Sequence, residues 1–593
     1  MVVVVAAALA VDPAGFRPFT TLRWAVVSTT VALAAAAVST RAPAGAHRRP
    51  TLAWAALLGL LAVATVAALD PVVAVVGHPR RHLGLIGWLV GGLAFLVGLR
   101  LTRDEQRVYL SRAVVLAGVV TGAGAVADWL GWDPPGLRFA DGRVGGLLGQ
   151  PVYLGALGVL LAPAALGIAA DPAFGRGWRR AAVVGAVGCT VAVVVSGTRG
   201  AWLGAVVAAA VGWPVLWRWI STHRVLAASI LLLVAGLAIG VSTGSRIATL
   251  FDPSAEGGRG RLDEWVLGLS VIADDPVTGA GPEGYRVAVL GHIDDGYARR
   301  HGRDEVVDRA HNGVLDVAVS AGIPAAAVYL LLLSTVVGRC RQVIRAPADR
   351  FLAGAAVGVV AWTVQLAVSF PVAEIDPVAW LLAGCVVSAG VGVGVDAATA
   401  GDARGSQRRR PATWLRLGAA ALAAVLAVGG VLALGADHDL RRAAQHRLTA
   451  PVEAMEAADR ATARRPDDTD AWYVAAQVAA SGPSLLALDA GLDRVEEGLR
   501  WSPRDPALRD LREALLVERA LRSGLPLDLR NARRATEERV AADPSGGVHH
   551  RRLGLVLAAQ GHSERAAAEL RRALQLDPDD VAAQDALDRR TPA

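Results

Sequence analysis

The chain has 593 residues, of which 53% are hydrophobic and only 19% charged, with a mean hydropathy of +0.42. A chain this apolar is not a single soluble domain, so the composition indicates an integral membrane protein with room for many spans and a second domain. No lysine occurs among its 60 basic residues, which excludes a lysine-type phosphate loop and Schiff-base chemistry. The formal charge of +7 comes from arginines clustered between apolar runs. They indicate membrane orientation, and no nucleic-acid partner is predicted.

Twelve apolar runs approach the length needed to cross the roughly 30 Å hydrocarbon core of a bilayer. The first eleven residues are too short to cross alone and could be the remnant of a further span. We therefore predict an all-α fold whose residues 1–436 form a polytopic helical membrane domain of about 12 spans. The expected spans are about 22–40, 51–69, 84–99, 108–130, 152–170, 181–196, 201–217, 225–241, 313–337, 351–370, 378–395 and 413–435.

Arginine clusters stand in alternate loops between these runs, and the positive-inside rule assigns such loops to the cytoplasm. The intervening loops carry fewer arginines and include the longest one, 242–312, which we therefore expect to be extracytoplasmic. The same alternation predicts that everything after Gly435 is extracytoplasmic. The clusters are Arg41, Arg48 and Arg49; Arg100, Arg103 and Arg107; Arg176, Arg179 and Arg180; Arg218 and Arg224; Arg339, Arg341, Arg345 and Arg350; and Arg404, Arg408, Arg409 and Arg410.

Residues 437–593 are polar and rich in Arg, Ala, Asp and Glu. The segment "HHRRLGLVLAAQGHSERAAAELRRALQLDPDD" has the spacing of a tetratricopeptide repeat, with small residues where two helices pack and a proline after the second helix. The matching positions are Leu553, Gly554, Leu557, Gly561, Ala566, Leu570, Ala573 and Pro578. Pro466, Pro503 and Pro544 punctuate the earlier chain at similar but irregular intervals. We predict three to four degenerate repeats in a TPR-like solenoid that binds a protein partner or shields the membrane face.

No metal site and no cofactor are predicted. Cys189, Cys340 and Cys385 lie in or beside apolar runs and have no CxxC spacing, which argues against a disulfide framework and a zinc site.

Two segments of the membrane domain look unlike ordinary connections. In "VSGTRGAWLG", Arg199 stands between two apolar runs, where an arginine is paired, extends to the interface or faces an anionic ligand. "GRGRLDEWVLGLSVIADDPVTGAGPEGYR" predicts a short amphipathic helix bearing Arg261 and Trp265, followed by a turn. This helix could bind a ligand, or it could lie in the membrane interface with Trp265 as an aromatic anchor.

A third segment, "DRAHNGVLDVAVSAGIP", begins the span at 313–337. Asn312, Asp316 and Ser320 recur at i, i+4 and i+8, which places a polar stripe on one helix face and indicates a wet cavity or a helix contact. His311 stands at the outer end of this stripe. It is either an interfacial residue or a catalytic one whose tautomer Asp316 or a neighbour could fix.

Taken in order, "GRVGGLLGQPVYLGALGVLLAP", "SGTRGAWLG", "GRLDEWVLGLSVIADDPVTGAGPEGY" and "AHNGVLDVAVSAGIP" resemble the O-antigen ligase and polymerase superfamily, which includes bacterial protein O-oligosaccharyltransferases. The resemblance covers about residues 70–395. One departure is "GQPVY", where relatives commonly show an asparagine-rich "GNPN", so no substrate contact is assigned near Gln150.

The resemblance implies a metal-independent glycosyltransferase of cell-envelope polysaccharide assembly, multi-pass in the plasma membrane of a bacterium. Its donor would be an undecaprenyl-diphosphate-linked glycan, and its acceptor a glycan, a lipid or a protein on the outer face. His311 is implied as the base on the acceptor hydroxyl, with Asn312 and Asp316 in support. Arg199, Arg261 and, less directly, Arg143 of "GRVGG" are implied as diphosphate ligands.

Ligase, polymerase and protein-glycosylating activity stay open at this point, as do the sugar, the acceptor and the oligomeric state. Two readings from other classes also stay open. A polytopic transporter would be favoured by inverted repeats and by helices broken at mid-membrane. A catalytically inactive cell-envelope scaffold would recruit partners through the repeats, and the presence of Arg199, Arg261 and His311 argues against it.

Overall fold

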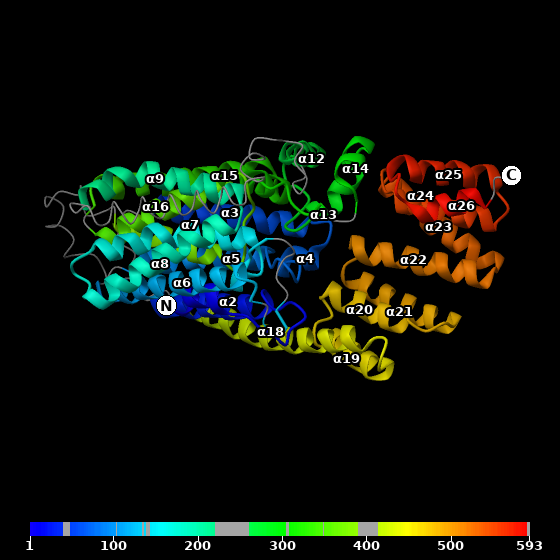
Figure 1. Ribbon diagram of the computed structural model, residues 1–593, viewed down its shortest axis with the longest axis horizontal. Coiled ribbons are helices and arrows are strands. Elements are labelled where there is room, and N and C mark those ends of the chain that lie inside the picture. Colours follow the sequence, from blue (N-terminus) through cyan, green and yellow to red (C-terminus); the bar gives the residue numbers. More distant parts are fainter. Residues whose placement is uncertain are drawn as a thin grey trace.

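The computed structural model describes residues 1–39, 48–101, 104–132, 134, 136–137, 143–219, 260–303, 307–347, 349–389 and 413–589. Every regular element in these ranges is a helix, so the predicted all-α class is confirmed. A long helical bundle occupies one side of the molecule, and a stack of shorter helices from the C-terminal part of the chain covers one end of it (Figure 1).

In the described ranges, seven helices are long and apolar enough to cross a membrane, and four shorter apolar helices lie among them. They account for every predicted span except 225–241, which lies outside the described residues, so the count of twelve is not confirmed. The helices are α2 (Thr21–Val38), α3 (Arg48–Val66), α5 (Leu85–Arg100), α6 (Asp104–Trp129), α7 (Pro151–Ala170), α8 (Arg176–Val195), α9 (Arg199–Trp219), α15 (Gly313–Arg345), α16 (Arg350–Leu366), α17 (Asp376–Ala389) and α18 (Thr413–His446).

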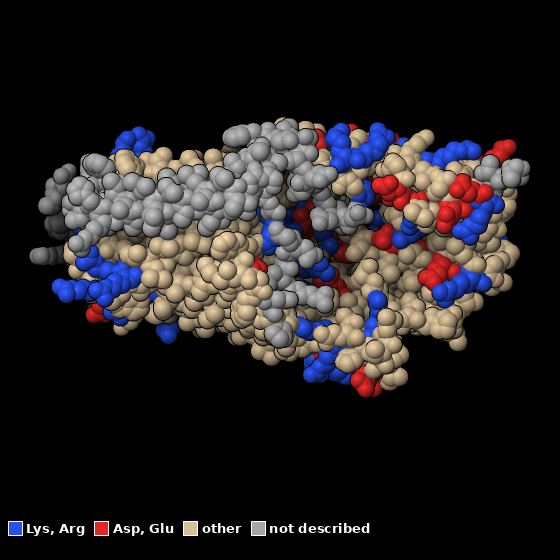
Figure 2. Space-filling model, in the orientation of Figure 1, with Lys and Arg blue, Asp and Glu red and all other residues tan. Residues whose placement is uncertain are grey.

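The middle of the bundle shows few charges on the visible face, whereas charged side chains gather toward its ends and over the C-terminal helices (Figure 2). This distribution suits a membrane-crossing belt. The first residues form α1 (Val2–Leu9), an eight-residue helix that packs against α2 and α6. At about 1.5 Å per residue, α1 is too short to cross a bilayer alone.

Small residues let the bundle helices approach closely. A Cβ atom on Gly354 or Gly358 of α16 would lie 2.2 Å from the backbone oxygen of Pro163 or Leu160 of α7. The two glycines are four residues apart and therefore share one helix face. Membrane helices commonly show this spacing of small residues. Inside a bilayer, close van der Waals packing holds helices together, because there is no water to exclude.

Residues 260–303 form a small unit at the end of the bundle beside the C-terminal helices (Figure 1). It comprises α12 (Arg261–Asp274), α13 (Tyr285–Ala288), η3 (Val289–His292) and α14 (Asp295–His301). Its buried residues make a core of their own with the first turns of α15, including Leu267, Tyr285, Tyr297 and Val319. The loop and the start of α15 therefore hold each other in place.

Helix α15 is broken at Ala321 and Gly322, where the backbone leaves helical geometry. The turn after α12 fills the break, because Ile323 N donates to Pro276 O and Ala280 N donates to Val319 O, both at 2.8 Å. Irregular backbone is tolerated in a membrane domain where other protein groups satisfy its hydrogen bonds. The "DDPVTGAG" turn is thus a strap across the ninth predicted span.

The C-terminal helices form antiparallel pairs of the predicted tetratricopeptide kind. The end of α18 pairs with α19 (Pro451–Arg464), and three further pairs follow in order. These are α20 (Thr469–Ala479) with α21 (Leu485–Trp501), α22 (Pro506–Ser523) with α23 (Pro526–Ala542), and α24 (Gly547–Ala559) with α25 (Ser563–Leu576), before the terminal α26 (Val581–Asp588). We call α19–α26 the repeat segment.

The sequence unit with the clearest spacing is the pair α24 and α25. Leu553, Leu557, Ala566 and Leu570 are buried between the two helices, as the spacing predicts. A Cβ atom on Gly554 would lie 2.8 Å from Leu570 Cγ, so only glycine allows this approach. The prolines at 466, 503 and 544 fall in turns between one pair and the next, and Pro578 falls in the turn between the last pair and α26.

Candidate active site

His311 lies in the turn immediately before α15, with a backbone φ of 51°. Its Nδ1 is 2.8 Å from Oε2 of Glu264 on α12, and its ring meets Phe370 edge to face at 5.3 Å. The histidine side chain is 31% exposed, whereas that of Glu264 is only 3% exposed. The ring is thus held from the protein side and remains open on another.

The two predicted supporting residues fix the backbone around His311. Asn312 caps α15, because its Oδ1 accepts from the N–H groups of Val314 and Leu315, and its Nδ2 donates to Ala367 O at 3.0 Å. Asp316 is buried and accepts a hydrogen bond from Ala310 N at 2.9 Å. The carboxylate in contact with the ring itself is that of Glu264.

A buried ion pair anchors the residues before His311. Arg309 Nη2 lies 2.8 Å from Oε1 of Glu283, and both side chains are almost fully buried. Glu283 Oε1 also accepts from Leu83 N at 3.1 Å, which ties this turn to the connection before α5. Asp308 pairs with Arg81, whose guanidinium lies 5.0 Å from the centre of the Phe370 ring.

The pKa of His311 is raised above 6.5 by the balance of two effects. Burial lowers it by disfavouring the charged ring, but the adjacent Glu264 carboxylate outweighs burial, with smaller contributions from Asp316 and Asp308. The pair therefore favours the imidazolium, which is the form that a histidine reaches after it accepts a proton.

Arg261 is the first residue of α12, and Glu264 follows it by three residues on the same helix face. Burial and the nearby charge of Arg199 lower the pKa of Arg261, while Glu264 raises it. Arg261 therefore lies within electrostatic range of both Arg199 and the histidine's partner. One helical turn joins the predicted anion ligand to the carboxylate that contacts the predicted base.

Arg199 is the first residue of α9, and the turn before it is tightly built. Gly197 has a φ of 59°, and Thr198 donates its hydroxyl to Pro151 O at the start of α7, at 3.1 Å. Arg143 Nη2 donates to Ser196 O at 3.1 Å and to Thr198 Oγ1 at 3.3 Å. Arg143 thus binds the turn that carries Arg199.

Printed contacts therefore form two groups: Arg143 binds the turn before Arg199 at the start of α9, and Asn312 and Asp316 hold the turn of His311, whose ring meets Glu264 on α12. Arg261, one turn before Glu264, feels the charge of Arg199. Sequence reasoning missed Glu264, Arg309 and Glu283. The signal for Glu264 was its i, i+3 spacing from Arg261, although spacing alone does not show that Glu264 is buried while the neighbouring Asp263 is partly exposed.

The two readings of the α12 segment are compatible. Glu264, Leu267 and Val271 are buried against the bundle. Leu262, Val266 and Leu269 point away and are more than half exposed. One face of α12 builds the site, and the other presents apolar side chains of the kind found at membrane interfaces.

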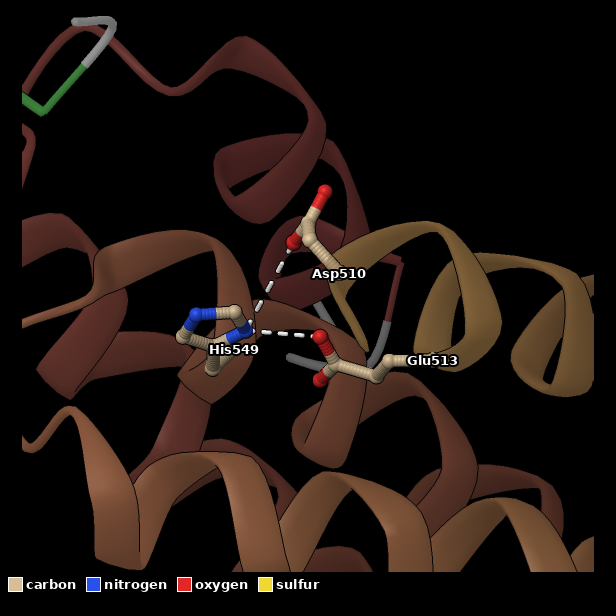
Figure 3. Close-up of side chains that lie close together, drawn as sticks. All are labelled: Asp510, Glu513 and His549. Atoms are coloured by element: carbon tan, nitrogen blue, oxygen red, sulfur yellow. Dashed lines mark hydrogen bonds and ion pairs between the residues drawn. The ribbon is translucent and has the colours of Figure 1, made fainter. Parts of the chain in front are cut away.

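A second polar cluster lies in the repeat segment (Figure 3). Ligand atoms of Asp510, Glu513 and His549 lie within 4.8 Å of one another. Arg552 Nη1 already bridges the two carboxylates, at 2.6 Å from Asp510 and 2.7 Å from Glu513, and His549 Nδ1 lies 2.6 Å from Glu513. We interpret the cluster as a salt-bridged contact between α22 and α24.

Residues 184–330 match the family model described as O-antigen ligase. Among solved structures, the chain is similar to one described as the crystal structure of the APC/C hetero-tetramer Cut9-Hcn1, at 14% identity, covering 86% of this chain and 92% of that chain, with a TM-score of 0.23. A TM-score this low does not establish a shared fold. No curated protein matches the chain. The matched range contains Arg199, Arg261 and His311, so the chain carries an O-antigen ligase family domain within a multi-pass helical membrane protein.

Proposed function

We propose that the protein transfers a glycan from an undecaprenyl-diphosphate-type lipid carrier to an acceptor hydroxyl on the outer face of a bacterial plasma membrane. The observation that carries this proposal is the contact of His311 with Glu264, one helical turn from Arg261 on α12, inside the matched ligase domain that also contains Arg199. Transfer to a finished lipid or glycan acceptor is ligase activity. Polymerase and protein O-glycosylating activities use the same chemistry with other acceptors.

A lipid diphosphate suits the charges of this site. Arginine guanidinium groups bind phosphate oxygens through paired N–H donors, and they stabilise the charge that develops on a diphosphate leaving group. The amino ends of α9 and α12 add partial positive charge at the same place. We assign the diphosphate to Arg199 and Arg261, with Arg143 supporting the turn before α9. These groups supply the positive charge that a metal ion supplies in other enzymes.

The transfer step then balances without an added reagent. His311 takes the proton of the acceptor hydroxyl as the acceptor oxygen bonds to the anomeric carbon of the donor. The bond from that carbon to the diphosphate oxygen breaks, and the lipid diphosphate leaves with the electron pair. Because Nδ1 faces Glu264, Nε2 is the ring nitrogen that meets the acceptor. The energy of the reaction comes from the diphosphate bond, so no nucleotide is needed outside the cell.

The transporter reading gains one observation, the break in α15 at Ala321 and Gly322. In transporters such breaks expose backbone groups to substrate or ions. Here the strap from Asp275 to Ala280 occupies the break and uses its hydrogen-bonding groups. We therefore prefer glycosyl transfer.

The proposed function is tested in membranes of the source organism that lack the gene. These should accumulate a glycan linked to a polyprenyl diphosphate, and adding the purified protein should release the free polyprenyl diphosphate while the glycan moves to an acceptor. Accumulation of an unlinked solute, or of no glycan, would count against glycosyl transfer.

A further inference from the structure

Three successive turns of the repeat segment lie against the end of the bundle and receive arginines from it. These inter-repeat turns are residues 465–468, 502–505 and 543–546, each between one helix pair and the next. They are the stretches around Pro466, Pro503 and Pro544, whose similar but irregular intervals in the sequence had indicated only where helices end.

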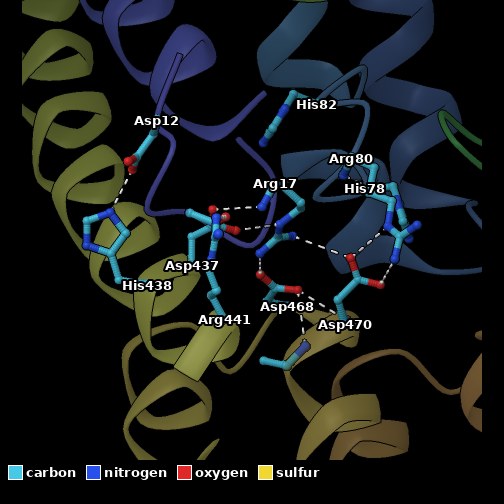
Figure 4. Close-up of polar contacts among 12 residues, drawn as sticks. Asp12, Arg17, His78, Arg80, His82, Asp437, His438, Arg441, Asp468 and Asp470 are labelled. Atoms are coloured by element: carbon cyan, nitrogen blue, oxygen red, sulfur yellow. Dashed lines mark hydrogen bonds and ion pairs between the residues drawn. The ribbon is translucent and has the colours of Figure 1, made fainter. Parts of the chain in front are cut away.

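The first two turns use an aspartate in the same way. Asp468 caps α20 through Oδ1, and its Oδ2 pairs with Arg17 Nη2 at 2.5 Å (Figure 4). Asp505 caps α22 through Oδ1, and its Oδ2 pairs with Arg286 Nη2 at 2.7 Å. Both aspartates are almost fully buried. In each aspartate, one carboxylate oxygen caps the first helix of a repeat, and the other pairs with an arginine outside the repeat segment.

The third turn contacts the long loop by a related arrangement. Asp543 pairs with Arg303, and Ser545 donates its hydroxyl to Oδ1 of Asp295 at 3.2 Å. The Asp295 carboxylate also accepts hydrogen bonds from Nη1 and Nη2 of Arg572 on α25, at 2.6 Å each. The long loop is therefore held at three positions: Arg286 on α13, Asp295 at the start of α14, and Arg303, two residues after α14 ends.

A parallel set of contacts reaches His311 by another route. Arg80 Nε binds Oδ2 of Asp470, at the start of α20, at 2.9 Å. The next residue, Arg81, pairs with Asp308 and lies over Phe370, the ring against which His311 packs. The repeat segment is thus joined through Arg80 and its neighbour Arg81 to Asp308, which precedes His311 in the chain, and to Phe370, which packs against its ring.

We infer that the second and third inter-repeat turns, 502–505 and 543–546, form an internal docking surface whose partner is residues 285–303 of the chain's own long loop. The repeat segment then serves as a fixed clamp on the loop that shares a core with α12 and α15. Paired and buried charges suit this role, because breaking one partner leaves an uncompensated charge. A protein partner of the repeat segment would then bind the helix faces that point away from the bundle.

The test neutralises the loop's anchors in the full-length protein: Arg286→Gln, Arg303→Gln and Asp295→Asn together. These changes leave the helix caps of Asp468 and Asp505 intact. The matched control is Arg512→Gln, Arg534→Gln and Glu538→Gln, which removes the same charges from exposed pairs within the repeat segment. The readout is amide hydrogen exchange, which reports local opening.

Exchange in residues 285–303 should rise about tenfold or more in the anchor variant and stay unchanged in the control, because only the anchor variant removes the charge-assisted hydrogen bonds that hold these residues. Exchange in α24 and α25 should match the wild type in both. Equal exchange of the loop in the anchor and control variants would overturn the clamp. If the triple variant does not fold, Arg286→Gln alone is measured against Arg534→Gln, with the same two outcomes.

Because exchange requires no substrate, this result is independent of the proposed function. A turnover assay on the same variants then asks whether the clamp serves the site. Faster loop exchange with unchanged turnover would show that docking does not position His311.

Discussion

His311 occupies a backbone conformation that a residue with a side chain rarely adopts, at φ 51°. Such geometry costs on the order of 1–3 kcal/mol and persists only where the surroundings enforce it. The enforcing contacts are the cap by Asn312, the hydrogen bond from Ala310 to Asp316 and the buried pair of Arg309 with Glu283. Together they aim the ring at Glu264 and leave it partly exposed.

The raised pKa of His311 predicts how turnover depends on pH. The base must be neutral to accept a proton, so turnover should fall as pH decreases through a pKa above 6.5. In Glu264→Gln, burial still lowers the pKa of His311, but the carboxylate that raises this pKa is gone. The acidic limb of the profile should therefore move to lower pH. The plateau rate should also fall, by about 10- to 100-fold, because the imidazolium loses a charged partner.

The pH profile of turnover in Glu264→Gln is compared with that of Asp263→Asn. Asp263 precedes Glu264 on α12 but pairs with Arg300 and His301 instead of His311. Its variant should keep the wild-type acidic limb. The same shift in both variants, or in neither, would remove Glu264 from the mechanism.

Arg199 and Arg261 are expected to bind the donor before the reaction as well as during it. Each change to alanine should weaken binding of farnesyl diphosphate, a soluble probe of the diphosphate site, by about 10- to 100-fold. Each change to lysine should recover only part of this, because an ammonium keeps the charge but loses the planar fork. Calorimetry measures the affinity, and wild-type affinity in both alanine variants would assign the arginines a structural role.

At the scale of elements, the crossing of α15 by the strap explains two glycines. A Cβ atom on Gly279 would lie 2.4 Å from Val319 O, and one on Gly322 would lie 2.0 Å from Val277 O. Both glycines also have positive φ, at 66° and 79°. Neither position accepts a side chain without moving the strap that follows α12.

Gly322→Ala should therefore destabilise the protein by roughly 1–3 kcal/mol, from backbone strain alone. The control is Gly338→Ala on the same helix, where a Cβ meets no atom within 4 Å and alanine favours the helix by about 0.5–1 kcal/mol. Thermal unfolding of the purified protein measures both. Gly322→Ala with the melting temperature of the Gly338 variant would show that the strap does not cross α15 this closely.

Hydropathy and repeat spacing predicted the elements well, because both depend on local patterns. Apolar length identified the spans that the structure describes, and the pairing of α24 with α25 follows from Gly554 and its neighbours. Local patterns did not reveal Glu264, since a buried carboxylate is recognised only from what surrounds it. The break in α15 was also missed, because the apolar run continues through Ala321 and Gly322.

At the scale of the molecule, the long loop and the repeat segment lie at the same end of the bundle (Figure 1). Ion pairs such as Arg286 with Asp505 join them directly. Arginine alternation in the loops predicts that this end is extracytoplasmic. The site residues and the repeats should therefore lie on the same side of the membrane.

A reporter active only outside the cytoplasm, fused after Ala593, should be active. A second fusion, in the predicted cytoplasmic loop between α15 and α16 near Ala346, should be inactive and serves as the control. Activity of only the second fusion would reverse the topology and place the site on the cytoplasmic side.

The central claim is that His311 is the base of a transfer reaction, and purified His311→Ala tests it most directly. General-base assistance is worth roughly 10²- to 10⁴-fold. The variant should lose turnover by about that factor, measured as polyprenyl diphosphate released in membranes lacking the gene. It should keep wild-type expression and farnesyl diphosphate affinity, because the diphosphate ligands are intact. Near-normal turnover in a folded His311→Ala protein would contradict the account and leave the histidine an interfacial residue.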